Sequence, residues 1–189
     1  MRYFILGLLA CAAIAACGNP LGLPAAYSSN TVDSLVSLYA LSGTPVSLPS
    51  GYSIYPFIGK HVVRTDQGNS FDFAFDIDTT GQAKLLPTGA LKLGKSGLQI
   101  SALQFDSIKF APTSGYKEDS AQVVNVNSVL ILHSSPLTCP FGLPGVYYAK
   151  LHVLAIDTTS TPNGRRIDFE VLNDLNCGYR GLQPGLPRQ

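Results

Sequence analysis

Cysteine is the residue type in this chain with the widest chemistry, because its thiolate is a nucleophile, a metal ligand and a partner in disulfides. The four cysteines are Cys11, Cys17, Cys139 and Cys177. They form no CxxC pair and do not stand at zinc-site spacing with the three histidines, so the sequence predicts no metal site built on them. Their chemistry therefore depends on the segments in which they lie.

The first two cysteines lie in an N-terminal stretch with the features of an export signal. Arg2 supplies a positive charge, and residues 3–16 form an uncharged apolar run of about 14 residues. A membrane-spanning helix needs roughly 20 apolar residues, so we expect residues 1–16 to be removed as a signal peptide. An ordinary secretory cleavage after Ala13-Ile14-Ala15 is one possible processing site.

The second possible processing site is Ile14-Ala15-Ala16-Cys17, which resembles the lipobox of bacterial lipoproteins. The resemblance implies that the Cys17 thiol receives a diacylglyceryl group, that cleavage occurs before Cys17, and that a fatty acid such as palmitate acylates the new amino terminus. Two or three acyl chains hold a protein on a membrane durably, whereas one chain does so marginally. Gly18, where inner-membrane lipoproteins often carry Asp, implies an outer-membrane location in the bacterial cell envelope.

Cys139 and Cys177 remain in the mature chain, where an exported protein meets an oxidising compartment. We therefore predict that these two cysteines form a disulfide. Closing a loop of this length stabilises a protein by about 4 kcal/mol in the chain-entropy model.

The composition of the mature chain gives few indications of partners. Loss of Arg2 from 13 basic residues leaves 12, equal to the 12 acidic residues. A neutral chain offers no electrostatic attraction for nucleic acid, so we expect none, and the predicted partners are the membrane through Cys17 and an unidentified protein or glycan. Residues 17–31, rich in Gly, Pro and Ser, predict a flexible tether that reaches up to about 45 Å from the lipid.

Residues 32–180 predict an all-β domain. In 71–78, Phe alternates with Asp and Ala, and the hairpin 146–172 alternates in the same way, whereas no segment has helical periodicity. We expect an antiparallel β-sandwich of about seven to ten strands, with a small closed barrel as the alternative. Residues 181–189 lack a core pattern and predict an exposed tail.

Three groups of residues are candidates for binding or catalysis. Asp76, Asp78 and Thr80 match the opening of a calcium loop, but Pro87 stands where the bidentate Glu belongs, so a hairpin turn is the preferred interpretation.

The aromatic side chains of the 52–57 segment could line a ligand site or simply cap the sandwich. Candidate carboxylates for glycoside hydrolysis lie on predicted outer faces, where solvation is usual. The aromatic and acidic candidates are Tyr52, Tyr55, Phe57, Asp72, Asp168 and Glu170.

No histidine or serine stands in a catalytic motif, and we expect neither an enzyme nor a cofactor. The segments FDFAFDIDTTGQ, YYAKLHV and NCGYRGLQPGLP resemble those of a group of small all-β bacterial lipoproteins, and the resemblance covers most of the mature chain without implying an activity. The sequence therefore predicts a membrane-anchored extracytoplasmic protein with a structural or binding role. Two other roles are possible interpretations of the sequence: a cell-envelope hydrolase with a site assembled from scattered residues, and an assembly subunit.

Overall fold

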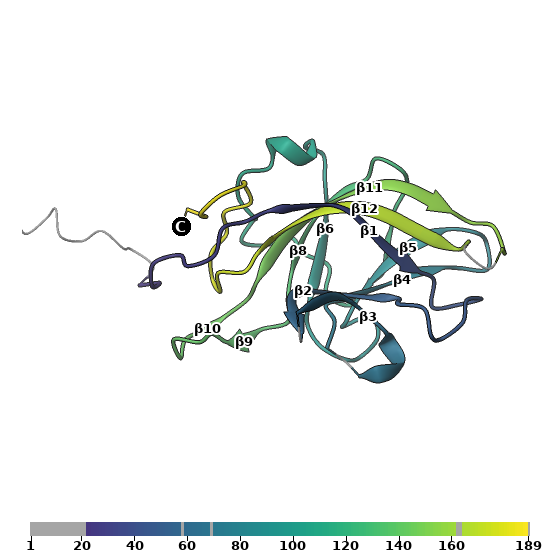
Figure 1. Ribbon diagram of the computed structural model, residues 1–189, viewed down its shortest axis with the longest axis horizontal. Coiled ribbons are helices and arrows are strands. Elements are labelled where there is room, and N and C mark those ends of the chain that lie inside the picture. The colour runs from purple at the N-terminus through teal and green to yellow at the C-terminus, as the bar shows by residue number, and fades with distance from the viewer. Residues whose placement is uncertain (1–21, 58, 69, 162–163, 189) are drawn as a thin grey trace, which may run out of the picture.

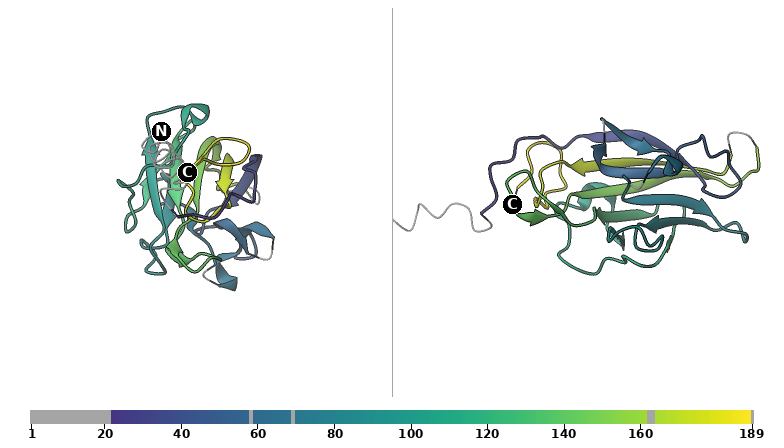
Figure 2. Two further views of the ribbon diagram at one scale, coloured as in Figure 1. Left: turned by 90° about the vertical axis from the view of Figure 1, so that its left-hand side faces the viewer. Right: turned by 90° about the horizontal axis from the view of Figure 1, so that it is seen from below.

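The computed structural model describes residues 22–57, 59–68, 70–161 and 164–188. The predicted signal peptide and Cys17 lie outside the described residues. The described chain is all-β, with almost no helix, and its strands form two five-stranded antiparallel sheets and a short ribbon (Figure 1). Figure 2 shows the domain end-on and from below, and the view from below shows its elongated shape with the first described residues at one end.

The strands of the first sheet, sheet I, follow the order β1-β12-β11-β8-β6. Their bounds are β1 Val32–Tyr39, β12 Arg166–Asp174, β11 Tyr148–Asp157, β8 Val129–His133 and β6 Gly97–Ser101. The second sheet, sheet II, has the order β3-β2-β4-β5-β7. Its strands are β3 Lys60–Val63, β2 Gly51–Phe57, β4 Phe73–Ile77, β5 Ala83–Pro87 and β7 Gln122–Val123.

The remaining elements are a two-stranded ribbon and two turns of 3₁₀ helix. The ribbon consists of β9 Leu137–Thr138 and β10 Pro144–Gly145, and the helices are η1 Thr65–Gln67 and η2 Phe105–Ser107. Both described sheets are open, because each has two strands that pair on one side only. The β-sandwich prediction is therefore confirmed, and the closed barrel does not form.

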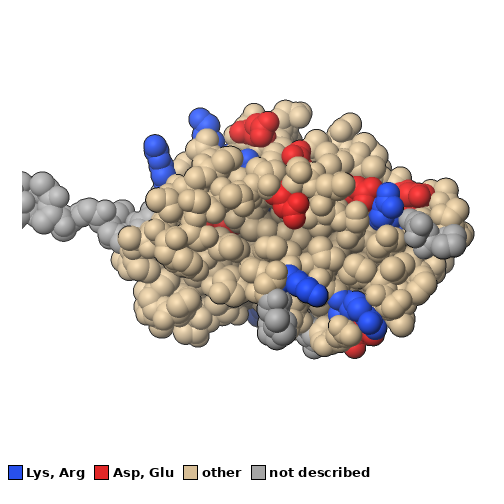
Figure 3. Space-filling model, viewed as in Figure 1, with Lys and Arg blue, Asp and Glu red and all other residues tan. Residues whose placement is uncertain are grey.

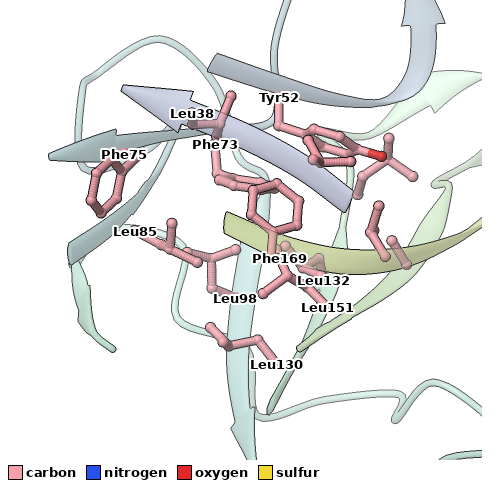
Figure 4. Packing of buried hydrophobic residues seen from close by; sticks show 14 of the residues in the cluster. Leu38, Tyr52, Phe73, Phe75, Leu85, Leu98, Leu130, Leu132, Leu151 and Phe169 are labelled. Atoms are coloured by element: carbon pink, nitrogen blue, oxygen red, sulfur yellow. The ribbon is translucent and has the colours of Figure 1, made fainter. Parts of the chain in front are cut away.

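The main core lies between the two sheets, as alternation in their strands predicts. Phe73, Phe75 and Ile77 of β4 are all buried, and they meet the inward side chains of sheet I (Figure 4). Phe169 of β12 contributes a ring that packs on Phe73, with their centroids 6.2 Å apart. Fully or almost fully buried residues of this core include Leu38, Tyr52, Leu85, Leu98, Leu130, Leu132 and Leu151.

Part of the outer face of sheet I, around Lys150, is also covered, which strand alternation does not predict. Alternation places Lys150 on a polar face, but only 2% of it is exposed. Its Nζ donates hydrogen bonds to the carbonyl oxygens of Phe105 (2.7 Å) and Ile108 (3.1 Å) and lies 4.4 Å from the centre of the Phe105 ring. A second apolar cluster surrounds this contact and comprises Phe105, Ile108, Ala111, Val129, Ile131, Leu172 and Leu182.

Both chain ends differ from their predictions, because polar side chains and Leu182 fix them to the domain. The Asn176 Oδ1 accepts the N–H groups of Tyr27 (2.8 Å) and Ser28 (3.0 Å), so this part of the predicted tether is docked on the domain, while residues 17–21 lie outside the described residues. Asn30 and Gly185 exchange two backbone hydrogen bonds, and Leu182 is fully buried. The predicted exposed tail is thus packed in part, while residues 183–186 are exposed.

The predicted disulfide between Cys139 and Cys177 is confirmed, with a Cα–Cα distance of 5.8 Å. It joins the β9–β10 ribbon to the chain that follows β12. Gly145 permits this contact, because a Cβ there would lie 2.5 Å from the Cys139 sulfur.

We predict that Cys139→Ala, Cys177→Ala and the double variant each lose about 2–4 kcal/mol of unfolding free energy, because the same 38-residue loop becomes unconstrained in the unfolded chain. Urea unfolding of oxidised protein measures this loss, and reduced wild-type protein is the control, which should match the double variant. An unfolding midpoint unchanged by either substitution would contradict the prediction.

Candidate functional site

A cleft of about 700 Å³ lies at the end of the sandwich where β4, β6 and β11 begin and where β5 and β8 end. We call it the terminal cleft. One wall comes from β2 and the chain before β4, and the opposite wall comes from the chain that leads from β8 into the β9–β10 ribbon. Its volume falls within the usual range for small-ligand sites. Its lining includes Ser53, Tyr55, Asp72, Thr88, Ser135 and Tyr147.

A pair of stacked tyrosines is the main aromatic feature of the terminal cleft. The Tyr55 and Tyr147 rings lie 4.6 Å apart between centroids, with an interplanar angle of 22°. Tyr147 is almost fully buried, and this burial raises its pKa to about 12. Tyr55 is 46% exposed, so its ring is supported by Tyr147 and still accessible to a ligand.

The other two aromatic candidates do not join this pair. Tyr52 is fully buried in the main core, where its ring stacks on Phe73 and its hydroxyl accepts a hydrogen bond from the Asn173 Nδ2 at 2.7 Å. Tyr52 and Tyr55 are three positions apart in a strand, and alternation therefore points them to opposite faces. Phe57 ends β2, and its side chain lies outside the described part of the structure.

Asp72 was expected to point outward into solvent, but it is buried at 8% exposure beside the terminal cleft. One carboxylate oxygen accepts the Ile54 N–H at 2.7 Å, and the other accepts the Ser135 N–H at 3.3 Å. Asp72 therefore connects sheet II to the chain after β8. Burial raises its pKa, although these two N–H donors and the nearby His133 act in the opposite direction.

The hydroxyl groups of Thr88 and Ser135 line the terminal cleft and form a network with the buried Ser96 hydroxyl. The Thr88 Oγ1 lies 2.7 Å from the Ser96 Oγ and 3.3 Å from the Ser135 Oγ. Ser96 also donates to the Asp72 carbonyl oxygen, and the Ser135 Oγ accepts the Lys95 N–H at 3.0 Å. No histidine lines the cleft in the described ranges, so its hydroxyls have no imidazole base within the site.

The calcium candidates have the hydrogen-bond pattern of a turn. The Asp78 Oδ1 accepts the backbone N–H groups of Thr80 and Gln82 at 2.8 and 2.9 Å, and its Oδ2 lies 2.6 Å from the Lys84 Nζ. The Asp76 carboxylate is bonded to Ser42. Both carboxylates are therefore engaged within the protein, as in an Asx turn.

The remaining titratable candidates are scattered over the domain. His152 pairs with Glu170 at 2.7 Å, and Asp168 pairs with Arg166 at 2.9 Å, both on the outer side of sheet I. Asp72 lies at the terminal cleft, so the three candidate carboxylates do not form one site. Across the described ranges, no three His, Cys, Asp or Glu residues group as metal ligands would.

Comparisons of this chain with protein-family models, curated proteins and solved structures found no match. In the described part of the chain, no helix is both long and apolar enough to cross a membrane.

We predict that Asp72 makes the unfolding free energy of the protein depend on pH. Since burial raises its pKa, the native protein binds more protons than the unfolded chain between about pH 4 and that raised pKa, and the unfolding free energy falls as pH rises through this window. Asp72→Asn removes this titration. The unfolding free energy of wild type minus that of the variant should therefore decrease from about pH 4 toward neutrality.

Urea denaturation at a series of pH values measures this difference. Asp174 is a second buried acid, with its pKa raised to about 6 mainly by burial. Because Asp174 is present in both proteins, its contribution cancels in the difference between their unfolding free energies. A difference that is constant or increases with pH would show that Asp72 does not carry the effect.

Proposed function

We propose that this protein is a lipid-anchored binding protein of the bacterial cell envelope, and that its terminal cleft takes a neutral ring-shaped ligand such as a sugar unit of an envelope glycan. The observation that carries the binding role is the Tyr55–Tyr147 pair, in which one ring is buried and holds the other at the cleft surface. A ring fixed in this way binds a flat apolar face at little cost in side-chain entropy.

The neutrality of the ligand follows from the charges of the terminal cleft. Asp72 is its one Asp, Glu, Lys or Arg in the described ranges, and both of its oxygens already accept backbone N–H groups. The cleft therefore offers a charged ligand no free counter-charge. Apolar walls with a few polar groups are typical of small-molecule sites.

The chemistry of the terminal cleft supports binding over hydrolysis. The Ser134 Oγ accepts the Tyr147 N–H at 2.9 Å and the Ser53 Oγ donates to the Tyr55 carbonyl, so these hydroxyls hold the cleft's own walls. A nucleophilic serine instead needs a base within hydrogen-bond distance. Fixed hydroxyl groups and an accessible ring in one cleft are suited to recognition.

The anchor is supported by the sequence Ile14-Ala15-Ala16-Cys17 and by the apolar run before it. The Cys139–Cys177 disulfide is consistent with an oxidising compartment outside the cytoplasm.

We expect Cys17→Ala to abolish incorporation of radioactive palmitate and to release the protein from the membrane fraction, because the acceptor thiol is removed. Cys11→Ala is the matched control, since it alters a cysteine of the predicted signal and leaves the acceptor in place. Undiminished label in the Cys17→Ala protein would rule out this anchor.

We expect Tyr55→Ala to weaken binding of an N-acetylglucosamine tetramer about tenfold, which corresponds to ~1.4 kcal/mol for the loss of one stacked ring. Isothermal titration calorimetry measures the affinity. Phe110→Ala is the matched control, because Phe110 is 45% exposed and does not line the terminal cleft. Equal affinity of the Tyr55→Ala and wild-type proteins, or no binding by wild type, would contradict a glycan site here.

A further inference from the structure

We infer that the tip of the β9–β10 ribbon, residues 140–144, contacts the acyl and headgroup boundary of the membrane that carries the lipid anchor. This inference rests on the proposed anchoring at Cys17. The tip adjoins the terminal cleft through Pro140, but Leu143, which the experiment below probes, does not line that cleft.

The first observation is the position of the ribbon tip relative to the chain that leads to Cys17. Pro24 and Tyr27 share the lining of a 220 Å³ cavity with Pro140 and Phe141, so the docked N-terminal segment lies against the tip. In Figure 1, β9 and β10 lie at the same end of the molecule as the first described residues, which are purple.

The second observation is the short distance that the chain allows between the domain and the lipid. Leu23 packs on Gly178, where a Cβ would meet the Leu23 Cδ2 at 3.0 Å. The six residue steps from Cys17 to Leu23 span at most about 20 Å, less than half the reach that a tether free to residue 31 would have. Docking of residues 23–30 therefore keeps this end of the domain near the bilayer surface.

The third observation is the absence of charge from the ribbon and from the segment that docks beside it, whereas the C-terminal segment at the same end carries Arg180 and Arg188. Residues 18–32 and 134–149 contain no Asp, Glu, Lys, Arg or His. Figure 3 shows the same property as an uncharged surface over β9 and β10. Since buried charge is costly at the bilayer interface, an uncharged tip is suited to contact with lipid.

The side chains at the tip are those that favour the membrane interface. Leu143 is 48% exposed at the turn of the ribbon, and Tyr27, which shares a cavity with Pro140 and Phe141, is 68% exposed. Tyrosine is enriched at this depth because its ring is apolar and its hydroxyl is polar. The Tyr27 hydroxyl donates to the Leu175 carbonyl at 2.7 Å, which fixes the ring at this end of the domain.

A bilayer fits this surface better than a second protein does. A stable protein interface uses roughly 20–30 residues on each side, whereas the exposed apolar tip is a five-residue turn beside one tyrosine. A weak lipid contact suffices when acyl chains already hold the domain at high effective concentration. The disulfide supports such a contact, because it fixes the ribbon at Cys139, immediately before the tip.

Fluorescence tests this contact without a background signal, since the chain contains no tryptophan. Full-length, processed Leu143→Trp protein is reconstituted in phosphatidylcholine vesicles whose acyl chains carry bromine. We expect bromine to quench about half of its emission, because the side chain reaches the acyl boundary. Tyr27→Trp tests the same surface if the first variant does not fold.

The matched control is Val46→Trp. Val46 is 74% exposed in the loop between β1 and β2, and that loop lies at the opposite end of the sandwich, where the Arg165 Nε donates to the Ser42 carbonyl. Its emission should be the same in brominated and unbrominated vesicles.

Three other results would overturn the inference, and they distinguish a failure of the lipid contact from a failure of the anchor. An acylated, vesicle-bound protein with no quenching at position 143 or 27 rules out the lipid contact and leaves the anchor intact. Blue-shifted emission without bromine quenching also overturns the lipid contact, because the indole is then shielded by protein and not by acyl chains. Intact mass without acyl chains, together with protein that stays in solution, overturns the proposed anchor and the lipid contact with it.

Discussion

The Cys139–Cys177 disulfide fixes the relation between the ribbon and the two chain ends. The ribbon forms one wall of the terminal cleft, and without the crosslink it would be attached to the sandwich mainly by its own short connections. Cys177 directly follows Asn176, whose side chain holds the N-terminal segment at Tyr27 and Ser28. One covalent constraint therefore connects the cleft wall, the end of β12 and the segment that leads toward Cys17.

Buried polar groups organise the two layers on either side of this constraint. Asp72 joins sheet II to the chain after β8 through two backbone N–H groups, and Lys150 joins sheet I to the segment around η2 through two carbonyl oxygens. Burial disfavours the charged form of both groups, because it raises the pKa of Asp72 and lowers that of Lys150. Removing such partners would leave buried backbone groups unpaired, which costs more than the net value of the hydrogen bonds themselves.

The terminal cleft combines a fixed interior with an accessible aromatic ring. Its hydroxyls bond mainly to one another and to the backbone, so they hold the walls in place, and Tyr55 is the most exposed of the aromatic residues that line the cleft. If the domain is held by Cys17, the same end of the sandwich faces the lipid, and the cleft lies where an envelope ligand near the membrane would be met. Under the proposed anchoring, the position of the terminal cleft and the chemistry of its lining both favour ligand recognition close to the membrane surface.

The sequence alone was sufficient for properties that depend on local pattern. Alternation in residues 71–78 predicted a strand, of which residues 73–77 form β4 with Phe73, Phe75 and Ile77 in the main core. The spacing of Asp78, Thr80 and Gly81 predicted a turn that the hydrogen bonds bear out. The disulfide also followed from the sequence, because the other two cysteines lie in the predicted signal and lipobox. These features depend on residues near one another in the chain or on a choice among very few partners.

Only the tertiary structure decided what covers each face. Alternation places Asp72 and Lys150 on outer faces, but it cannot show that distant segments fold over those faces and supply backbone partners. The same limit applies to Tyr52 and Tyr55, which look alike in sequence but lie in the core and at the terminal cleft respectively. The docking of residues 23–30 and of Leu182 likewise depends on residues far away in the chain, because their contacts are long-range and leave no local periodicity.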